Sequence, residues 1–364
     1  MEIISIYNKF KECGVVTTDT RTLKGGEMFF ALKGENFDGN EYALKALELG
    51  ARYAVVNRGS KVGTDCAAGL LDADAAGRLI LVDDTLKTLQ ELARWHRSMT
   101  FVDGKPLTVI ALTGTNGKTT TVTLLHRLFT SLGYSCGLLS TIANYVGEKA
   151  SEAVNTTSDP LVTNSLLNEM VNEGCEYCFM EVSSIGVEQE RVTGLKFKAG
   201  IFSNLTHDHL DYHKTFAEYL RVKKSFFDSL PKEAFALVNV DDKNGSVMVQ
   251  NTAARVQTLS LRSMADFRCK IIEMQLDGML LQLDGREVWL RQLGRFNAYN
   301  LLTIYATALL LGADKEEVLC LMSTLDSVSG RFETVYAPDG TVAIVDYAHT
   351  PDALENLLVS ADHV

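Results

Sequence analysis

The chain has 364 residues, of which 46% are hydrophobic and only five are prolines, so its composition excludes a disordered protein and is typical of a soluble globular protein with two or three domains. The formal net charge of −11 argues against a general binder of nucleic acids or membrane surfaces, so positive charge must be local wherever a nucleotide binds. The N-terminus lacks a basic region followed by an apolar core, and no run approaches about eighteen uninterrupted apolar residues, which predicts a cytoplasmic protein.

Residues 1–103 form the first zone, in which strand and helix signals alternate. Apolar runs at 26–32 and 53–56 predict strands, and the pattern of 41–49 predicts a helix. The first zone is therefore a small α/β domain. It ends at a predicted linker, 103–106, in which Asp, Gly, Lys and Pro follow one another.

The second zone, 104–331, opens with the most informative stretch of the chain. An apolar strand pattern at 107–112 leads through the loop 114–120 into a helix pattern that stops at Gly133. Leu112 occupies the place of the first glycine of the usual P-loop motif, so the prediction of a phosphate loop depends on this strand-loop-helix context.

The polar residues of this loop suit a phosphate ligand. Gly114 and Gly117 allow backbone N–H groups to turn toward an anion, and the start of the helix adds its positive end. Lys118 can reach the β- and γ-phosphates, and the Thr119 hydroxyl can ligate Mg²⁺. We therefore predict ATP as the ligand; an incidental turn rich in glycine and threonine is the alternative.

Further apolar runs at 177–182, 200–203 and 235–240 predict successive buried strands of a parallel, doubly wound sheet. Ligands of such a sheet gather at the C-terminal ends of its strands. Asp-Gly pairs at 277–278 and 284–285 punctuate short alternating runs and predict an antiparallel extension at the sheet edge.

Three features after these strands suggest a metal or phosphate site. Glu181 ends a buried strand, where a carboxylate is costly unless it meets a cation or donors. Segment 204–213 places three His and two Asp after the next strand, which predicts a metal site beside Glu181, with a hydrogen-bonded loop as the alternative. Lys223 and Lys224 either lie in a solvated basic turn, or one of them points into the phosphate site.

The end of the second zone and the third zone add nucleotide candidates. Asn297 and Asn300 open a long apolar helix, and Asn297 is either its N-cap or, with Asn300, a contact to base or phosphate. Arg331 lies at a domain junction, where its charge can clamp a nucleotide on closure. The third zone, 332–364, holds one predicted strand and one helix, too little for a core, so we expect the rest of that domain to be absent or supplied elsewhere.

The seven cysteines suit reduced thiols, because their number is odd and they are scattered through the chain. Cys175 and Cys178 have C-x-x-C spacing but run directly into an apolar strand, and no second Cys or His pair accompanies them. We therefore predict buried structural thiols.

Several segments, in this order, closely resemble the Mur ligase family: 113–120, 155–160, 180–184, 208–213, 330–333 and 346–351. The resemblance covers the chain from about residue 107 to its end and is greatest to the members that add a diamino acid to the muramyl peptide. It implies an α/β fold with a small N-terminal uridine-nucleotide domain (1–103), a central doubly wound, mostly parallel sheet with a P-loop (104–331) and the incomplete beginning of a Rossmann-like C-terminal domain (332–364).

The implied activity is that of an ATP-dependent acid–amino-acid ligase of peptidoglycan synthesis. Such ligases join UDP-N-acetylmuramoyl-L-alanyl-D-glutamate to diaminopimelate or lysine. ATP converts the D-glutamate side-chain carboxylate into an acyl phosphate, which the incoming amine attacks, and the protein contributes mainly positioning and electrostatics. The expected partners are these two substrates, with ATP and Mg²⁺ as cofactors, no nucleic acid and no membrane, and the chain is expected to be a monomer.

The resemblance also assigns roles to single residues. Lys118 and Thr119 match the positions that hold the ATP phosphates and Mg²⁺, while Glu181 and His209 match metal ligands. Lys223 matches the lysine that the family carbamylates, which would convert a cation into an oxygen ligand for Mg²⁺. The remaining ATP positions are Gly114, Thr115, Asn116, Gly117, Thr120, Asn297, Asn300, Arg331, Asp346 and His349. The positions that hold the UDP-muramyl substrate are Thr156, Thr157, Ser183, Gln189 and Arg191.

Some segments depart from the diamino-acid ligases. The first zone, with 17–21 and 30–39, looks more like the ligase that adds D-Ala-D-Ala, although both types bind a uridine nucleotide there, so Thr20 and the loop 34–39 stay candidates for UDP contact. Ile185 stands where a His is usual. The specificity motif for the amino acid is expected beyond Val364. The alternatives are therefore a D-Ala-D-Ala ligase and a nucleotide-binding fragment without turnover.

Overall fold

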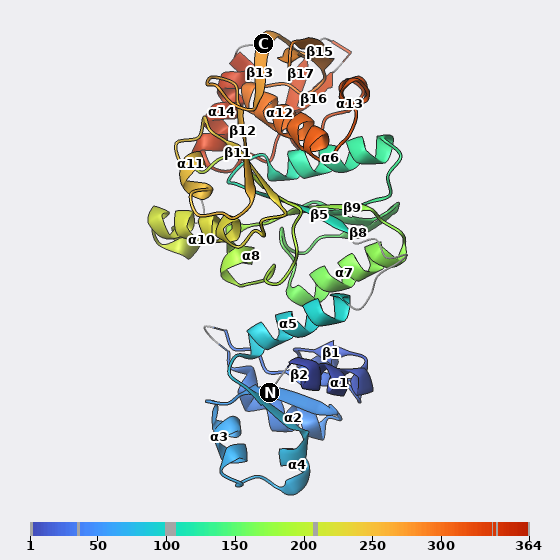
Figure 1. Cartoon of the computed structure of the whole chain (residues 1–364), viewed down its shortest axis with the longest axis vertical. Helices are drawn as coiled ribbons and strands as arrows, with labels where there is room; N and C mark the ends of the chain where they lie inside the picture. Colours follow the sequence, from blue (N-terminus) through green and yellow to red (C-terminus); the bar gives the residue numbers. More distant parts are fainter. Residues whose placement is uncertain are drawn as a thin grey trace. The chain divides into compact units, whose positions relative to one another are not determined.

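The computed structural model describes residues 3–34, 37–98, 107–206, 210–336, 338–339 and 341–362. Its contacts divide the chain into two compact units, Met1–Thr100 and Phe101–Val364, each of which is described by itself (Figure 1). The three-domain boundaries expected from the sequence stay predictions.

The first unit is a parallel sheet with the strand order β1-β2-β3-β4. All three residues of β2 are buried, and Phe29 packs with Ala54 and Val56 of β3 in one core. The elements of this unit are α1 (Ile3–Cys13), β1 (Val16–Thr17), η1 (Thr20–Thr22), β2 (Met28–Phe30), η2 (Gly39–Tyr42), α2 (Ala43–Glu48), β3 (Tyr53–Asn57), α3 (Lys61–Ala67), α4 (Ala73–Arg78), β4 (Leu79–Val82) and α5 (Thr85–Ser98).

The second unit is built on one large mixed sheet with the described strand order β15-β14-β13-β12-β11-β10-β5-β9-β6-β7-β8. The strands from β13 to β6 pair in parallel, and both edges are antiparallel. The antiparallel extension expected after residue 277 is therefore present, and a second one, β7–β8, was not predicted.

The elements of the second unit, in chain order, are β5 (Thr108–Thr113), α6 (Lys118–Ser131), β6 (Cys136–Leu139), β7 (Ala143–Val146), β8 (Lys149–Glu152), α7 (Pro160–Asn172), β9 (Tyr177–Glu181), α8 (Ser184–Glu188), β10 (Ala199–Phe202), α9 (Leu210–His213), α10 (Phe216–Asp228), β11 (Phe235–Asn239), α11 (Gly245–Met248), β12 (Arg255–Ser260), β13 (Phe267–Gln275), β14 (Gly278–Leu283), β15 (Arg286–Leu290), α12 (Arg295–Leu310), α13 (Lys315–Met322), β16 (Glu333–Tyr336), β17 (Val342–Val345) and α14 (Pro351–Asp362).

The central parallel strands β5, β6, β9, β10 and β11 are almost wholly buried because both faces of the sheet are covered there. Along β5, Ile110 and Leu112 enter the core that contains α6 and α12, whereas Val109 and Ala111 enter the core that contains α7 and α10. Figure 1 shows α6 and α12 on one side of β5 and β9 and α7 on the other. The predicted doubly wound sheet is therefore confirmed, and it brings the C-terminal ends of β5, β9 and β10 side by side.

The last described segments join the core of the second unit. Strands β16 and β17 pair as an antiparallel sheet, where the sequence analysis expected a single strand. Phe332 is buried in the α6–α12 core, and Ile344 and Leu357 pack against that core. Cys175 and Cys178 are thiols rather than disulfide partners, and both are buried, as predicted. Within the described residues, no helix has the length and apolar character needed to cross a membrane.

Candidate functional site

The loop between β5 and α6 needs glycine at two positions. Gly114 has φ +153° and Gly117 has φ +86°, and Gly117 is the N-cap of α6. A Cβ atom on Gly114 would overlap Ser203 Oγ, and one on Gly117 would overlap Asn300 Oδ1. The chain therefore passes too close to β10 and α12 for any side chain at these positions.

Residues after β10 hold this loop in place. The amides of Thr115 and Asn116 donate to Asn204 O and Asn204 Oδ1, both at 2.9 Å. The Ser203 hydroxyl donates to Asn116 O at 2.8 Å, and Thr115 Oγ1 lies 3.0 Å from the hydroxyl of Tyr219. With these loop amides engaged, the first N–H groups of α6 are the donors available to an anion.

Two lysines converge on the loop from different helices. Lys118 Nζ donates to Gly114 O at 3.0 Å and to Thr115 O at 2.8 Å. Lys223 Nζ, on the buried face of α10, donates to the same Gly114 O at 2.8 Å. Lys224 instead pairs with Asp228 at 2.7 Å. Of the two adjacent lysines, Lys223 is thus the one that faces the phosphate loop.

A pocket of about 430 Å³ lies over the C-terminal ends of the strands. The predicted site residues that line it are Thr115, Asn116, Gly117, Lys118, Thr119, Thr120, Thr156, Glu181, Asn300, Arg331, Asp346 and His349. The described candidates of the second unit that do not line it are Gly114, Thr157, Ser183, Gln189, Arg191, Lys223 and Asn297. His209 lies outside the described residues.

Glu181 is fully buried at the end of β9, and Thr141 supplies donors to both of its oxygens. The Thr141 amide donates to Glu181 Oε1 at 2.8 Å, and the Thr141 hydroxyl donates to Oε2 at 3.1 Å. Among the described ion pairs none involves Glu181. A buried carboxylate with no ion pair among the described residues, facing a pocket that Thr119 also lines, fits a divalent metal ion.

The described residues contain no group of three His, Cys, Asp or Glu side chains that would hold a metal by themselves. Mg²⁺ usually takes one or two carboxylates and completes its shell with water and substrate phosphates, so Glu181 and the Thr119 hydroxyl in one pocket suit this ion. His213, from the His- and Asp-rich segment 204–213, is buried, and its Nε2 lies 2.8 Å from Ser184 Oγ. His207 and Asp208, like His209, lie outside the described residues.

Four candidates for substrate contact form a network behind Glu181. Thr157 Oγ1 donates to Glu181 O at 3.0 Å and accepts from the Ser183 amide at 2.9 Å. Arg191 Nη1 donates to Thr157 O at 2.6 Å, and Arg191 Nη2 donates to Gln189 Oε1 at 2.6 Å. These residues brace the loop that carries Thr156 into the pocket.

Asn297 is not the N-cap of its helix, so that reading of the sequence is wrong. Helix α12 begins one turn earlier than expected, with Gly294 as its N-cap. Asn297 is buried, and its Nδ2 donates to Leu293 O at 2.8 Å. Its Oδ1 accepts from Asn300 Nδ2 at 2.9 Å, which turns the Asn300 carbonyl toward Gly117.

The last segment contributes Arg331, Asp346 and His349 to the pocket. Arg331 Nη2 donates to Thr119 Oγ1 at 3.3 Å, and its guanidinium lies 4.7 Å from the centre of the Tyr347 ring. Asp346 accepts from the amides of Phe332 and Ala348 at 2.7 and 2.6 Å. Arg331 is therefore next to the phosphate loop, and Asp346 fixes the backbone that carries it.

The sequence analysis missed Asp241, which follows β11 and lines the same pocket. Asp241 accepts hydrogen bonds from Ser260 Oγ at 2.7 Å, the Leu261 amide at 2.8 Å and the Tyr299 hydroxyl at 2.9 Å. Burial raises the pKa of Asp241, but these donors outweigh burial and lower it overall. Burial, and then the bond to Asp241, raise the pKa of Tyr299 to about 12. The rule that ligands gather at strand ends was the available signal.

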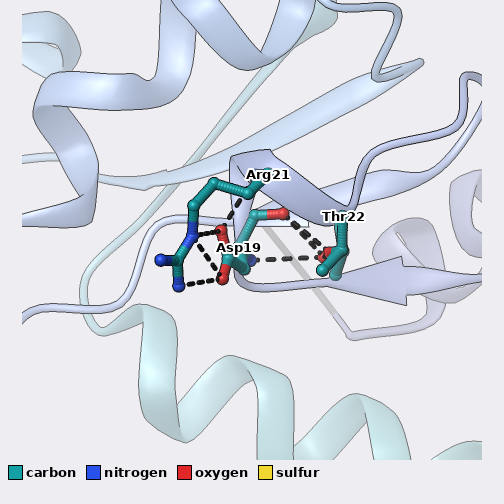
Figure 2. Close-up of polar contacts among 4 residues, drawn as sticks. Asp19, Arg21 and Thr22 are labelled. Atoms are coloured by element: carbon teal, nitrogen blue, oxygen red, sulfur yellow. Dashed lines mark hydrogen bonds and ion pairs between the residues drawn. The ribbon is translucent and has the colours of Figure 1, made fainter.

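In the first unit, Thr20 is half-buried in the short helix η1, next to the exposed Arg21 and Thr22. Figure 2 shows Arg21 folded back onto Asp19, whose carboxylate is 2.6 Å from Arg21 Nη2 and caps η1 through the Arg21 amide. Thr17 Oγ1 and Thr22 Oγ1 lie 2.9 Å apart and close the turn. In the loop 34–39, the other candidate for contact with the uridine nucleotide, the Gly39 amide donates to Leu32 O at 2.8 Å. Residues 35–36 of this loop lie outside the described part of the chain.

Comparison with known families decides the classification. Residues 112–308 match the Mur ligase middle domain, and residues 13–97 match the domain described as "Mur ligase family, catalytic domain". The chain belongs to the Mur ligase family. This confirms the resemblance inferred from the motifs and extends it to the first zone.

The chain is also similar to individual members of the Mur ligase family, both in sequence and in structure. The chain is 49% identical over 351 residues to the UDP-N-acetylmuramoyl-L-alanyl-D-glutamate--2,6-diaminopimelate ligase of Phocaeicola vulgatus. The aligned region covers 96% of this chain and 69% of that protein. A solved structure of a ligase with this name has a TM-score of 0.78 at 27% identity, over 96% of this chain and 70% of the other. A MurF ligase of Thermotoga maritima, solved in complex with ADP, shares the fold with a TM-score of 0.68 at 20% identity, over 96% and 74%.

Proposed function

We propose that this chain is an ATP-dependent ligase that adds diaminopimelate to UDP-N-acetylmuramoyl-L-alanyl-D-glutamate. The observation that carries the proposal is the pocket in which the phosphate loop, Glu181 and Thr156 meet, on a chain 49% identical to a ligase of that name. The identity extends over 96% of the chain and so includes the first zone, which supports this activity over the addition of D-Ala-D-Ala.

In the proposed reaction, the amides at the start of α6 and Lys118 bind the β- and γ-phosphates of ATP. Lys118 exchanges its two carbonyl partners for phosphate oxygens, and Arg331 adds positive charge beside Thr119. Both cations stabilise the charge that moves onto the leaving phosphate as the D-glutamate carboxylate attacks. The amine of diaminopimelate then attacks the acyl carbon, loses a proton and expels inorganic phosphate, which leaves the amide bond; ADP is the product of the first step.

The metal site in this proposal comprises Thr119, Glu181, His209 and a carbamate on Lys223. Mg²⁺ bound there supplies charge neutralisation on the phosphate oxygens. Support for the Lys223 assignment comes from its burial and its contact with Gly114 O, which keep its amine at the phosphate loop and out of bulk solvent. Intact-mass and crystallographic data with bound nucleotide test the modification; an unmodified amine beside bound metal contradicts it.

The remaining substrate assignments follow the network described above. Thr156, Thr157, Ser183, Gln189 and Arg191 would hold the muramyl dipeptide, and Thr20 and the loop 34–39 the uridine nucleotide. The remaining ATP assignments are kept as proposals. They include the buried Asn297, which would act by holding Asn300 through their hydrogen bond. We also propose that the protein acts in the cytoplasm as a monomer.

Mass spectrometry of reaction products tests the function. The purified protein is incubated with Mg²⁺-ATP, the muramyl dipeptide and either diaminopimelate or lysine, and separately with the muramyl tripeptide and D-Ala-D-Ala. We expect a diaminopimelate adduct together with ADP and phosphate. Product only with D-Ala-D-Ala would overturn the assignment, and binding of both nucleotides without any product would support a non-catalytic role.

A further inference from the structure

Thr141 contacts Glu181 more closely than any residue singled out from the sequence. It lies in the connection between β6 and β7, and strand β6 is the parallel neighbour of β9, which carries Glu181. The Ser140 hydroxyl donates to Ala143 O at 2.7 Å and closes this connection into a tight turn. Thr141 is therefore held at the end of the strand next to that of Glu181.

The contacts from Thr141 fix the orientation of the Glu181 carboxylate. The amide reaches one oxygen and the hydroxyl reaches the other, at 2.8 and 3.1 Å, so both ends of the carboxylate are held by one residue. A glutamate side chain has several rotatable bonds, and two donors from a rigid turn restrict the rotation of its carboxylate group. Each oxygen still has a lone pair for a further ligand.

The Thr141 hydroxyl also lies 3.1 Å from Thr156 Oγ1. A hydroxyl has one hydrogen, so it donates to one of the two oxygens at a time, and the ionised Glu181 is the stronger acceptor. Thr141 consequently lies between the carboxylate that faces the phosphate loop and the threonine proposed to contact the muramyl substrate. All three side chains line the same pocket.

We propose that Thr141 is a positioning residue for the metal ion of the reaction, because it holds the Glu181 carboxylate in the orientation that ligates it. This inference rests on the proposed function, which supplies the metal. Outer-shell donors to a ligating carboxylate typically contribute about 10- to 100-fold to metal affinity. Thr141 itself does not contact the metal or the reacting atoms.

The test is a titration of Mn²⁺, which prefers the same oxygen ligands as Mg²⁺, into protein saturated with a non-hydrolysable ATP analogue, followed by electron paramagnetic resonance. Thr141→Val removes the hydroxyl and keeps the shape, and Thr141→Ser retains the hydroxyl. Thr307→Val is the control, because Thr307 is more deeply buried than Thr141, does not line the pocket and donates to Thr303 O at 2.7 Å within α12.

We expect Thr141→Val to weaken Mn²⁺ binding about tenfold or more, and Thr141→Ser and Thr307→Val to stay within about threefold of the unmodified protein. Affinity for the analogue without metal should not change in any variant, since Thr141 has no described contact with the phosphate loop. That readout separates a misplaced carboxylate from a damaged pocket. If Thr141→Val fails to fold, Thr141→Ala provides a second variant without the hydroxyl.

Mn²⁺ affinity of Thr141→Val or Thr141→Ala equal to that of the unmodified protein would overturn the inference and leave the proposed function intact. Equal losses in Thr141→Ser and Thr141→Val would also overturn it, because packing rather than the hydroxyl would then matter. If the unmodified protein binds the analogue but no Mn²⁺, both the inference and the metal site of the proposed function are wrong.

Discussion

The phosphate loop of the second unit and the Thr17–Thr22 turn of the first are both short polar segments that the sequence marks as nucleotide contacts. Partners from β10, α10 and α12 surround the phosphate loop, and they lie far from it in sequence. The turn is exposed and is closed by bonds among residues at most five positions apart (Figure 2). A substitution in the loop therefore disturbs several distant elements at once, whereas one in the turn has only local consequences.

The largest expected effect comes from Gly117→Ala. The new Cβ would overlap Asn300 Oδ1, and the residue would keep a positive φ, so we expect a loss of about 2 to 4 kcal/mol in the free energy of unfolding and no measurable ATP binding. Gly133→Ala is the control, because Gly133 has φ +92° but no atom within 4 Å of a Cβ. It should cost about 1 kcal/mol. Denaturant unfolding that gives equal losses for the two variants would contradict the close-approach argument.

Lys118→Ala probes the charge of the loop rather than its shape. Because Lys118 lies near charge that develops in the transition state, we expect ATP-dependent phosphate release to fall by about 100-fold or more. The folded structure should persist, as judged by circular dichroism, since the ammonium group donates to two carbonyls of its own loop, Gly114 O and Thr115 O, and joins no distant element through them. Lys224→Ala, which removes the lysine paired with Asp228, is the control and should keep its activity. Near-normal phosphate release by Lys118→Ala would exclude this role.

Tyr299→Phe tests the far end of the pocket. Loss of the hydrogen bond to Asp241 should lower the free energy of unfolding by about 1 kcal/mol. The raised pKa of Tyr299, about 12, favours the neutral phenol in the folded state, so this contribution is complete below about pH 10 and is lost as the pH rises through 12. Absorbance of tyrosinate should show one late-titrating group fewer in the variant. An unchanged titration curve would mean that Tyr299 ionises normally.

The smallest effect is expected in the exposed turn. The hydrogen bonds from Arg21 lower the pKa of Asp19 to about 2, so its stabilising contribution is present above the ordinary aspartate pKa and is lost as the pH falls toward 2. Since the pair is exposed, added salt should raise the pKa observed by NMR. Asp19→Asn should lower the thermal midpoint at neutral pH only slightly, because an exposed ion pair contributes little to stability. A clear drop would show that the turn is tied to more than its own residues.

The contrast between local contacts and contacts distant in sequence also explains which features of the fold and the site were predictable from the sequence. The order of β5, loop and α6 follows from the apolar run, the glycines and the helical spacing of buried residues, all of which are local signals. The glycine contacts with Ser203 and Asn300 are not local, and neither is the pairing of Thr141 with Glu181, because both depend on which strands become neighbours in the sheet. The alternative of Asn297 as an N-cap failed because Gly294, which has no side-chain oxygen to mark a cap, begins the helix one turn earlier.

The carbonyl oxygen of Gly114 accepts hydrogen bonds from Lys118 and Lys223 together. A main-chain oxygen is not removed by substitution of its own residue, but a side chain at position 114 would overlap Ser203 Oγ and so displace this oxygen from both lysines. Any change that moves one of the two Nζ groups alters the surroundings of the other through an atom that both share. The effects of replacing the two lysines should therefore be non-additive, and the difference from additivity in a double-mutant cycle measures how strongly α6 and α10 depend on each other during nucleotide binding.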